Sequence, residues 1–370
     1  MASTSTALVL HGAKDLRLEN RDIDAPPADH VQINVLATGL CGSDLHYYTH
    51  NCNGAFAVQS PMVLGHESAG IITAVGPGVT HVSVGQKVAI EAGVACANCD
   101  YCQKDRYNLC AGMSFRSSAK TFPHADGTMQ TLINQPAKLA HVLPENVTVE
   151  MGALVEPLSV LIHASRRAAL GSTPGQRVII FGAGAIGLLA ASTALGKGVK
   201  LGDVVMVDIN QERLDFAKEH GFAGAVHCLE PKRLTGVEGL DHSKKVAEQW
   251  GSEFDVAFEC TGVESCMQMA IYSARTGGKV MLIGMGTPNA FLPISNAAVR
   301  EVDILGSFRY ANTYPEAIQM FADGKLSGIT DIITHRIPLE KDGVSKAFEA
   351  MAKGKDEDGK LVIKVIVGSA

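Results

Sequence analysis

The stretch VIIFGAGAIG, residues 178–187, decides the fold of the second half of this chain. Its first four residues are apolar and predict a buried strand, and an apolar helical run follows the stretch. Gly182, Gly184 and Gly187 form the pattern G-x-G-x-x-G, whose glycines let the backbone approach a pyrophosphate at the helix N-terminus. The turn therefore predicts a dinucleotide site, with Ile186 as a further contact.

The residues after the next apolar run favour NAD over NADP. Asp208 ends VVMVD, about 20 residues past Gly187, where a carboxylate can accept hydrogen bonds from the adenosine ribose hydroxyls. Asp208 would repel a 2'-phosphate, and the following residue, Ile209, carries no positive charge to hold one. The alternative is a tight strand-to-helix turn in which Asp208 only caps a helix, and the spacing of Asp208 disfavours it.

Apolar periodicity divides the chain into regions of different type. From Arg177 to about residue 300, strand-like runs such as VVMVD and FDVAFECTG alternate with helical stretches such as QERLDFAKEHG, which predicts a doubly wound parallel sheet of the α/β class. Before about residue 155, short runs such as HVQINVLATGL and QKVAI, separated by Gly and Pro, predict a β-rich unit. EVDILGSFRY and HRIPL, after residue 300, are again β-like, and residues 230–245 predict an irregular surface segment.

Length and composition exclude several classes of protein. The chain has 370 residues, more than one hydrophobic core usually serves, so two domains are expected. A net charge of −6 gives no electrostatic reason to expect nucleic-acid binding. The sequence predicts neither a signal peptide nor a membrane span, which needs about 18 consecutive apolar residues. Nine cysteines, an odd number, indicate free or metal-bound thiols in a reducing compartment, the cytoplasm.

Four of these cysteines lie close together in CANCDYCQKDRYNLC, residues 96–110. Cys96, Cys99, Cys102 and Cys110 follow the spacing C-x2-C-x2-C-x7-C, which is typical of a tetrahedral zinc site. Four thiolates leave zinc no vacant position for water or substrate, so the site is expected to be structural. A reduced lobe without metal is the alternative.

A second group of potential ligands is more dispersed. GLCGSDLH contains Cys41, GHES contains His66 and Glu67, and LVEPLS contains Glu156. One thiolate and one imidazole, with carboxylates available, suit a zinc ion that keeps an open position and polarises an alcohol oxygen. By spacing alone, a buried cysteine and a core histidine are more common than ligands, so the residues by themselves leave both interpretations open.

Several ordered motifs give the chain a resemblance to a known family over nearly its full length. GHESAGIITAVGPGV has the Gly-His-Glu opening and the glycine spacing of the zinc alcohol dehydrogenase signature. GLCGSDLH, the four-cysteine lobe, VEPLSV, GAGAIG and FRYANTYPEAI accompany it. The chain thus resembles the zinc-dependent medium-chain dehydrogenases, and within them the sorbitol and other polyol dehydrogenases.

The resemblance implies a fold and a reaction. The fold would be a GroES-like β-rich catalytic domain, residues 1–158 and 301–370, with a Rossmann NAD-binding domain at residues 159–300. The enzyme would carry two zinc ions per chain, one catalytic and one structural, and form a homotetramer or dimer. It would reversibly oxidise a secondary alcohol of a sugar alcohol, such as sorbitol to fructose; xylitol, L-arabinitol and galactitol dehydrogenases are the alternatives. A sensor that kept the fold and lost catalysis is a different class, and the intact ligand set argues against it.

The resemblance also assigns roles to individual residues. The catalytic zinc ligands would be Cys41, His66 and Glu67, with Glu156 as a catalytic residue beside the metal that also contacts substrate. A proton relay would pass through Ser43 and His46. Expected substrate contacts are Tyr47, Arg309 and Tyr310. Beyond the glycine-rich turn and Asp208, the expected NAD contacts are Arg213, Gly284, Met285, Gly286 and Phe308.

Three points stay open in the sequence. Glu156 has a plainer alternative role, as the cap of a following helix. Either Glu67 or Glu156 could be the permanent zinc ligand. The segment FRSSAKTFPHADG, residues 115–127, looks longer than its usual counterpart in the family, so the resemblance carries no substrate contacts onto residues 115–122.

Overall fold

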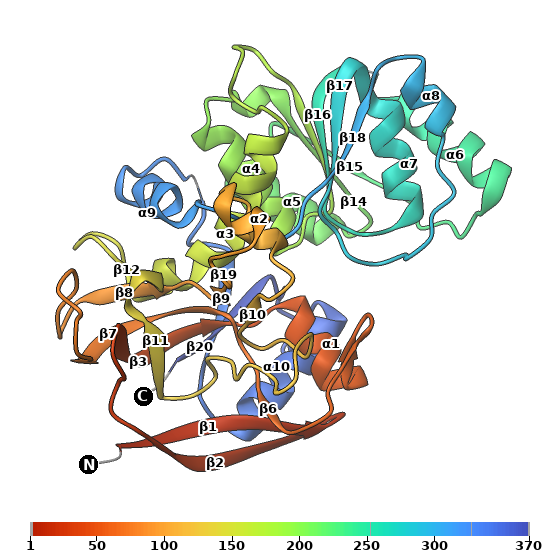
Figure 1. The fold of residues 1–370 in the computed structure, drawn as a ribbon. Helices are drawn as coiled ribbons and strands as arrows, with labels where there is room; N and C mark the ends of the chain where they lie inside the picture. Colours follow the sequence, from red (N-terminus) through yellow and green to blue (C-terminus); the bar gives the residue numbers. More distant parts are fainter. Residues whose placement is uncertain (1–2, 252, 327, 369–370) are drawn as a thin grey trace. The chain divides into compact units, whose positions relative to one another are not determined.

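The structure is a computed structural model that describes residues 3–251, 253–326 and 328–368. The chain divides into two units, and both ends of the chain contribute to the first of them (Figure 1). Unit 1 comprises Met1–Pro157, Tyr314–Asp323 and Ile333–Ala370. Unit 2 comprises Leu158–Thr313 and Gly324–Ile332.

Unit 1 is built on β-sheets, as its short apolar runs predict. Its largest sheet has, in order, the strands β12 (Ala140–Val142), β8 (Lys87–Ile90), β7 (Glu67–Val75), β3 (His30–Gly39), β20 (Lys364–Gly368) and β19 (Ile333–Pro338), with β11 (Leu132–Pro136) paired to β3. Strand β3 pairs antiparallel with β7, β11 and β20, so it is the centre of the sheet. Val31, Ile33 and Val35 of β3 are buried in one apolar cluster, as expected when alternate side chains of a strand face a core.

A second core of unit 1 joins strands from the start of the chain to helices from both ends. Its elements are β1 (Ser3–Gly12), β2 (Asp15–Ile23), β6 (Met62–Val63), α1 (Gly42–His50) and α10 (Lys341–Lys353). Tyr48 of α1 stacks on Phe348 of α10 with ring centroids 4.8 Å apart. This contact fixes α1, the helix that follows Cys41, against the C-terminal part of the chain.

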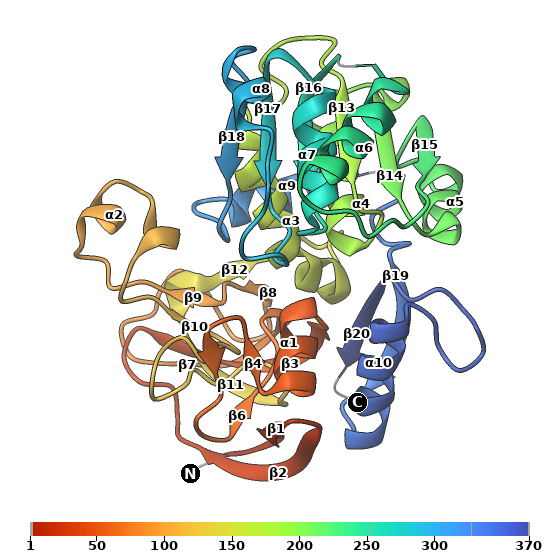
Figure 2. The same cartoon turned by 90° about the vertical axis from the view of Figure 1, so that its right-hand side faces the viewer.

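The remaining elements of unit 1 are short strands, helical turns and one longer helix, α9. They are β4 (Cys52–Asn53), β5 (Phe56–Ala57), β9 (Gly93–Val94), β10 (Ser114–Phe115), α2 (Asp100–Gln103), η1 (Tyr107–Leu109), η2 (Ala137–Leu139) and α9 (Tyr314–Ala322). Figure 2 shows α2 and its loop standing out beside β9 and β10. Helix α3 (Val149–Arg167) begins in unit 1 and ends in unit 2.

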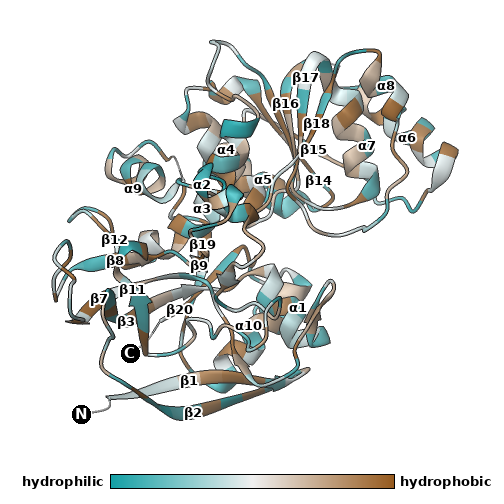
Figure 3. Ribbon diagram, in the orientation of Figure 1, coloured by the Kyte–Doolittle hydropathy of each residue, from teal (hydrophilic) through white to brown (hydrophobic). Residues whose placement is uncertain are grey.

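Unit 2 has the doubly wound parallel sheet that the alternating pattern predicts. In sheet order its strands are β15 (Ala225–Cys228), β14 (Val204–Asp208), β13 (Val178–Phe181), β16 (Phe254–Glu259), β17 (Ala274–Leu282) and β18 (Asp303–Gly306), all paired in parallel. In chain order this is 3-2-1-4-5-6, the Rossmann arrangement, with the reversal at β13. The strands are largely hydrophobic (Figure 3). The α/β fold class is therefore confirmed.

Helices and one short turn connect the strands of unit 2. They are α4 (Ala185–Gly196), η3 (Leu201–Asp203), α5 (Gln211–Glu219), α6 (Gly236–Glu248), α7 (Glu264–Ser273) and α8 (Ile294–Ala298). Helix α6 occupies most of the segment 230–245, which was predicted to be irregular, so that prediction was wrong. The buried side of this helix is formed by Gly239, Ser243 and Ala247. Because these residues are small and weakly apolar, the sequence shows little of the apolar periodicity that predicts a helix.

The second domain boundary differs from the predicted one at residue 300. Strand β18 pairs in parallel with β17, so residues just past 300 complete the sheet of unit 2, and the chain stays in that unit as far as Thr313. The sequence of a short strand does not indicate which sheet the strand will join.

Within the described residues, no helix combines the length and the apolar character that crossing a membrane requires.

Candidate metal centres and cofactor site

The four lobe cysteines converge in unit 1 although they come from a loop with little regular structure. Their sulfur atoms all lie within 4.8 Å of one another. The separation is 3.4 Å between Cys96 and Cys110, 3.5 Å between Cys99 and Cys102, and 3.9 Å between Cys96 and Cys102. A tetrahedral shell with Zn–S bonds of about 2.3 Å has sulfur atoms about 3.8 Å apart. All four are free thiols, so their arrangement fits one zinc ion and no disulfide.

The lobe is anchored to the sheet beside it by a chain of polar side chains. The Tyr107 hydroxyl donates to Glu91 Oε1 at 2.6 Å, and Glu91 Oε2 lies 2.7 Å from His141 Nε2. Glu91, which directly follows β8, is buried, whereas Cys96 is exposed. The loop is therefore held at its base, with the Cys110 thiol buried and the Cys96 thiol near solvent.

The second group of ligands lies inside unit 1, where the pairing of two strands brings distant residues together. Gly39 at the end of β3 pairs with Glu67 at the start of β7. Cys41 follows β3 and precedes α1, and His66 precedes β7. Ligand atoms of Cys41, His66 and Glu67 therefore lie within 4.8 Å of one another. The side chains of His66 and Glu67 are buried. The strand register, not the sequence spacing, assembles this group.

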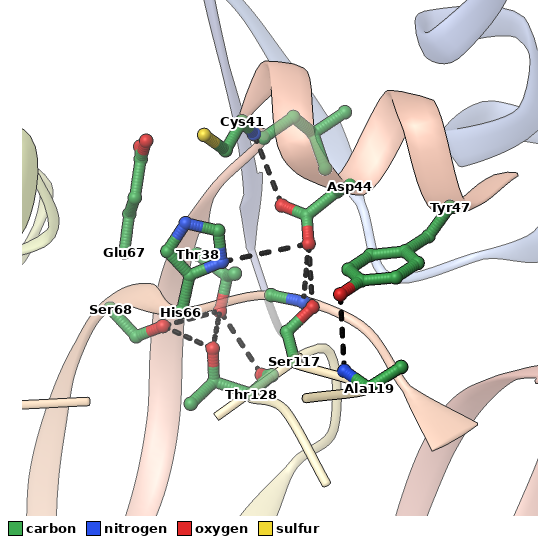
Figure 4. Close-up of polar contacts among 12 residues, drawn as sticks. Thr38, Cys41, Asp44, Tyr47, His66, Glu67, Ser68, Ser117, Ala119 and Thr128 are labelled. Atoms are coloured by element: carbon green, nitrogen blue, oxygen red, sulfur yellow. Dashed lines mark hydrogen bonds and ion pairs between the residues drawn. The ribbon is translucent and has the colours of Figure 1, made fainter. Parts of the chain in front are cut away.

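Asp44 supports this group from within α1 (Figure 4). Its carboxylate is fully buried; Oδ2 accepts from the Cys41 N–H at 3.1 Å, and Oδ1 accepts from the Gly65 N–H at 3.1 Å and from the Ser117 hydroxyl at 2.7 Å. Oδ1 also lies 3.6 Å from His66 Nδ1. A carboxylate on one imidazole nitrogen leaves the other nitrogen, Nε2, for a metal. The sequence contained Asp44 in a quoted motif, but no role was predicted for it.

The charges around His66 favour a cation at this place. Burial lowers the pKa of His66, but the negative charges of Asp44 and Cys41 outweigh burial and raise the pKa well above its ordinary value. Burial also raises the pKa of Asp44, and the charge and hydrogen bonding of His66 more than offset it, so the pKa of Asp44 is lowered. A site that stabilises positive charge on this imidazole suits a zinc ion, which supplies that charge in place of the proton.

Glu67 has a partner that the sequence did not reveal. Lys364 of β20 donates from Nζ to both oxygens of Glu67, at 3.0 and 2.7 Å, and to the Leu40 carbonyl at 3.1 Å. Both charged side chains are buried. Burial lowers the pKa of Lys364, but the charges of Glu67 and Cys41 outweigh it and raise that pKa. Gly39 has no side chain because a Cβ there would collide with Glu67 Oε2.

Glu156 lies inside α3, seven residues after its first residue, so it does not cap that helix. Its side chain is buried, and its negative charge also raises the pKa of Lys364. The alternative role as a helix cap was therefore wrong. Two buried carboxylates, Glu67 and Glu156, act electrostatically on the same ammonium group.

The remaining predicted residues of the reaction site lie on α1 in unit 1 and just after β18 in unit 2. Ser43 and His46 lie three residues apart on α1, Ser43 half-buried and His46 exposed. Tyr47 is 1% exposed and its hydroxyl accepts from the Ala119 N–H at 3.1 Å, so it is a core side chain, and its predicted contact with substrate is not favoured by this burial. Phe308, Arg309 and Tyr310 follow β18 in unit 2, where the Arg309 guanidinium lies 4.9 Å from the Phe308 ring centroid and Tyr310 is buried.

The glycine-rich turn of unit 2 joins β13 to α4 at the point where the strand order reverses. Gly182 has φ +100°, which favours glycine, and a Cβ at Gly187 would collide with the Gly182 carbonyl. Asp208 Oδ2 accepts from the Ala183 N–H of this turn at 2.6 Å, and Oδ1 accepts from the Asn210 N–H at 2.8 Å. The carboxylate is thus fixed beside the turn, and each oxygen keeps acceptor capacity.

A further predicted NAD residue, Arg213, adjoins the turn. Asn210 caps α5 by accepting from the Arg213 N–H at 3.2 Å, and the Arg213 guanidinium lies beside Gly184. Ile209 is 62% exposed next to Asp208. The edge of the sheet beside the turn therefore presents one carboxylate and one guanidinium.

Gly284 to Gly286 pack tightly on a second turn at the same end of the sheet. A Cβ at Gly284 or Gly286 would collide with Gly262, and the Thr287 N–H donates to the Gly262 carbonyl at 2.9 Å. Met285 between them is 69% exposed. The buried Glu259 accepts from the Gly262 N–H at 3.0 Å and also from Thr261, so it holds this turn; the sequence gave no indication of that role.

Comparison with known proteins matches both units. Residues 27–145 match the family model of the alcohol dehydrogenase GroES-like domain, and residues 185–323 match that of the zinc-binding dehydrogenases. The chain is 42% identical to a sorbitol dehydrogenase of Gallus gallus over 366 residues, 98% of each chain. It is 42% identical to the Homo sapiens sorbitol dehydrogenase over 348 residues, 94% of this chain and 93% of that protein.

Solved structures give the same result. L-idonate 5-dehydrogenase from Escherichia coli has a TM-score of 0.85 and 28% identity, with 100% of this chain and 99% of that chain covered. The 2R,3R-butanediol dehydrogenase from Bacillus subtilis has a TM-score of 0.80 and 27% identity, with 99% and 100% covered. The relatives and solved structures named here are matched over 93–100% of their own lengths.

Proposed function

The chain belongs to the zinc-dependent medium-chain dehydrogenases, and we propose that within this family it is an NAD-dependent polyol dehydrogenase that oxidises sorbitol to fructose. One observation carries the proposal: a thiolate, an imidazole and a carboxylate converge in a buried site whose histidine faces a buried aspartate. Three such ligands leave zinc an open position for the oxygen of a substrate, which the four-cysteine lobe does not.

The residues around the site suggest how each would contribute to the reaction. Zinc bound here supplies a Lewis acid that makes the substrate alcohol easier to deprotonate. Cys41, His66 and Glu67 would hold it. Asp44, whose Oδ1 lies 3.6 Å from His66 Nδ1, would hold the orientation of His66, and Lys364 balances the charge of Glu67. This assignment treats Glu67 as the ligand and leaves the carboxylate of Glu156 to orient the substrate hydroxyl.

The proton would leave along one face of α1. Ser43 and His46 are three residues apart, so their side chains lie on the same face of the helix. Ser43 is half-buried and His46 is exposed. Exposure to solvent therefore increases from Ser43 to His46, as a proton path from a buried ligand site to solvent requires.

The cofactor proposal is NAD, with the adenosine ribose on Asp208. Its carboxylate is fixed by two backbone donors and stays available to ribose hydroxyls, while its charge disfavours a 2'-phosphate. Further proposed contacts to NAD are Gly182, Gly184, Ile186, Gly187, Arg213, Gly284, Met285, Gly286 and Phe308. The double variant Asp208→Ser, Ile209→Arg should shift the preference toward NADP in steady-state assays. A wild-type enzyme that uses both cofactors equally would overturn the assignment.

The substrate proposal rests on the sorbitol dehydrogenases, which are 42% identical to this chain. A polyol suits a site with hydrogen-bonding side chains, because an apolar alcohol would leave them unpaired. Arg309, Tyr310, Glu156 and Tyr47 are the proposed contacts; Tyr47 and Tyr310 are both buried in this structure, so burial does not rank one tyrosine above the other. Homo-oligomerisation and a cytoplasmic location are also proposed; the nine free thiols support the latter.

An activity panel tests the proposal. Zinc-loaded enzyme is assayed with NAD and with NADP against sorbitol, xylitol, L-arabinitol and galactitol, and a Cys41→Ser variant serves as the inactive control. We expect sorbitol oxidation with NAD and little with NADP. A clear preference for another polyol would replace sorbitol by that substrate, and failure to oxidise any of the four would contradict the polyol assignment.

A further inference from the structure

Ser117 has a backbone conformation that its residue type does not explain. Its φ is +58°, in the left-handed region where residues other than glycine are strained, and its side chain is 3% exposed. Such strain persists where the surrounding structure determines it, and it is concentrated at functional sites. Glycine would avoid the strain, so a serine at this position requires a reason in its hydroxyl group.

The loop around Ser117 is held firmly on both sides. The half-buried Arg116 guanidinium donates to Gln135 Oε1 at 2.7 and 3.0 Å, to the Asn134 carbonyl at 2.7 Å and to the Asp126 carbonyl at 3.1 Å. The Ser117 N–H donates to the Ala125 carbonyl at 3.0 Å. These bonds fix the backbone of the loop and, with it, the direction of the Ser117 side chain.

The hydroxyl group of Ser117 points at the carboxylate that supports the metal ligands (Figure 4). It donates to Asp44 Oδ1 at 2.7 Å, and the same oxygen lies 3.6 Å from His66 Nδ1. The other oxygen of Asp44 accepts from the Cys41 N–H. The Asp44 carboxylate thus contacts the backbone of one predicted ligand, Cys41, and lies beside the imidazole of another, His66. The Ser117 hydroxyl fixes the rotation of this carboxylate.

We propose that Ser117 is a positioning residue of the catalytic zinc site, which acts through Asp44 on His66. Without the hydroxyl, the Gly65 N–H is the one hydrogen-bond donor left at Asp44 Oδ1 among the described residues, and the carboxylate can rotate away from His66 Nδ1. His66 then loses part of the orientation that presents Nε2 to a metal. The loop of residues 115–127 thereby affects metal binding although it supplies no ligand. This inference rests on the zinc site of the proposed function and not on its substrate.

Ser117→Gly is the variant that isolates the hydroxyl. It removes the donor and, because glycine adopts positive φ without strain, it leaves the backbone conformation favourable. Ser118→Ala is the matched control: Ser118 is buried in the same loop, and within the described residues its hydroxyl accepts from the Lys120 N–H at 3.3 Å rather than donating to Asp44. Both variants keep the Arg116 anchor.

Three measurements on the same preparations test the proposal. Competition with a chromophoric chelator gives the zinc affinity of each of the two sites, the absorption bands of Co²⁺ substituted at the open site report its geometry, and thermal unfolding reports stability. Partners outside the ligand shell typically change metal affinity 10- to 100-fold. Since Ser117 acts through one more residue, we expect about a 10-fold loss at the open site in Ser117→Gly, with shifted Co²⁺ bands and an unchanged lobe site.

The results separate this role from a purely structural one. A lower melting temperature with unchanged zinc affinity and Co²⁺ spectrum would overturn the proposal, and so would an equal loss of affinity in Ser118→Ala. The measurements use no polyol and no NAD. A failure of the substrate assignment would therefore leave them interpretable, and their failure would leave the activity panel unaffected.

Discussion

The two cysteine-bearing sites of unit 1 differ in how their ligands are supported. The lobe takes four thiols from residues 96–110, and one of them, Cys96, is exposed. The Cys41 site takes three different ligand types from the adjoining ends of two paired strands, β3 and β7, and is surrounded by buried charged residues, Asp44 and Lys364. The four thiols of the lobe could fill a tetrahedral metal shell by themselves, whereas the three ligands of the Cys41 site would leave one position open and are held by neighbouring charged residues. This contrast is the one expected between a structural and a reactive metal.

The largest expected effect is the loss of the open site itself. Cys41→Ser should abolish dehydrogenase activity and reduce zinc from about two equivalents to about one per chain, because the thiolate ligand is removed while the lobe stays intact. Elemental analysis and an activity assay check it. Cys52→Ser, another half-buried thiol of unit 1, should leave both values unchanged. Loss of both zinc ions in Cys41→Ser would break the distinction between the sites.

The next effect concerns the buried ion pair between Lys364 and Glu67. The four lobe thiols form no such pair with one another. Lys364→Met leaves the Glu67 carboxylate buried without its cation, a change that typically costs about 3–5 kcal/mol. We expect the metal-free protein to lose more stability than the zinc-loaded protein, because zinc supplies positive charge at the same place. Chemical unfolding of both forms measures the difference. Lys360→Met, at an exposed lysine, is the control; an equal loss in both forms would contradict the shared role.

A smaller effect is expected at Glu156, which lies outside the predicted ligand set. Glu156→Gln keeps the size and hydrogen bonding of the side chain but removes its charge. We predict a loss of turnover of about 10- to 100-fold with both zinc ions and NAD binding retained. Turnover, zinc content and melting temperature are measured on one preparation. If zinc were lost as well, Glu156 would be a permanent ligand; near-normal turnover in a destabilised protein would refute the catalytic role.

The smallest effect on catalysis is expected from the lobe. Cys99→Ser opens the four-thiolate shell, so zinc should fall to about one equivalent while turnover per remaining zinc changes little. Thermal unfolding should show lower stability, since a structural zinc contributes folding free energy. An unchanged stoichiometry would show that the lobe holds no metal, and a loss of turnover as large as in Cys41→Ser would remove the functional contrast between the two sites.

Much of the architecture could be predicted from the sequence because the signals are local. VIIFGAGAIG with Asp208 indicated the Rossmann unit, and β13, its glycine turn and β14 lie as expected. The cysteine spacing in residues 96–110 likewise predicted a cluster that the structure contains. Each of these predictions concerns residues that are close together in the chain, so their spacing in the sequence is enough to predict that they lie together in the structure. Strand β18 was assigned to the other domain because strand pairing is not a local property.

The Cys41 site was predicted only through family resemblance, and its supporting residues were not predicted at all. Cys41, His66 and Glu67 are brought together by the register of β3 and β7, and Lys364 reaches Glu67 across 297 positions of the chain. Ser117 reaches Asp44 across 73 positions. The sequence by itself determined the residue types and the elements that carry them. Only the tertiary structure decided which charges face one another, because buried charges are placed by the packing of distant strands and loops and leave no periodic signal in the chain.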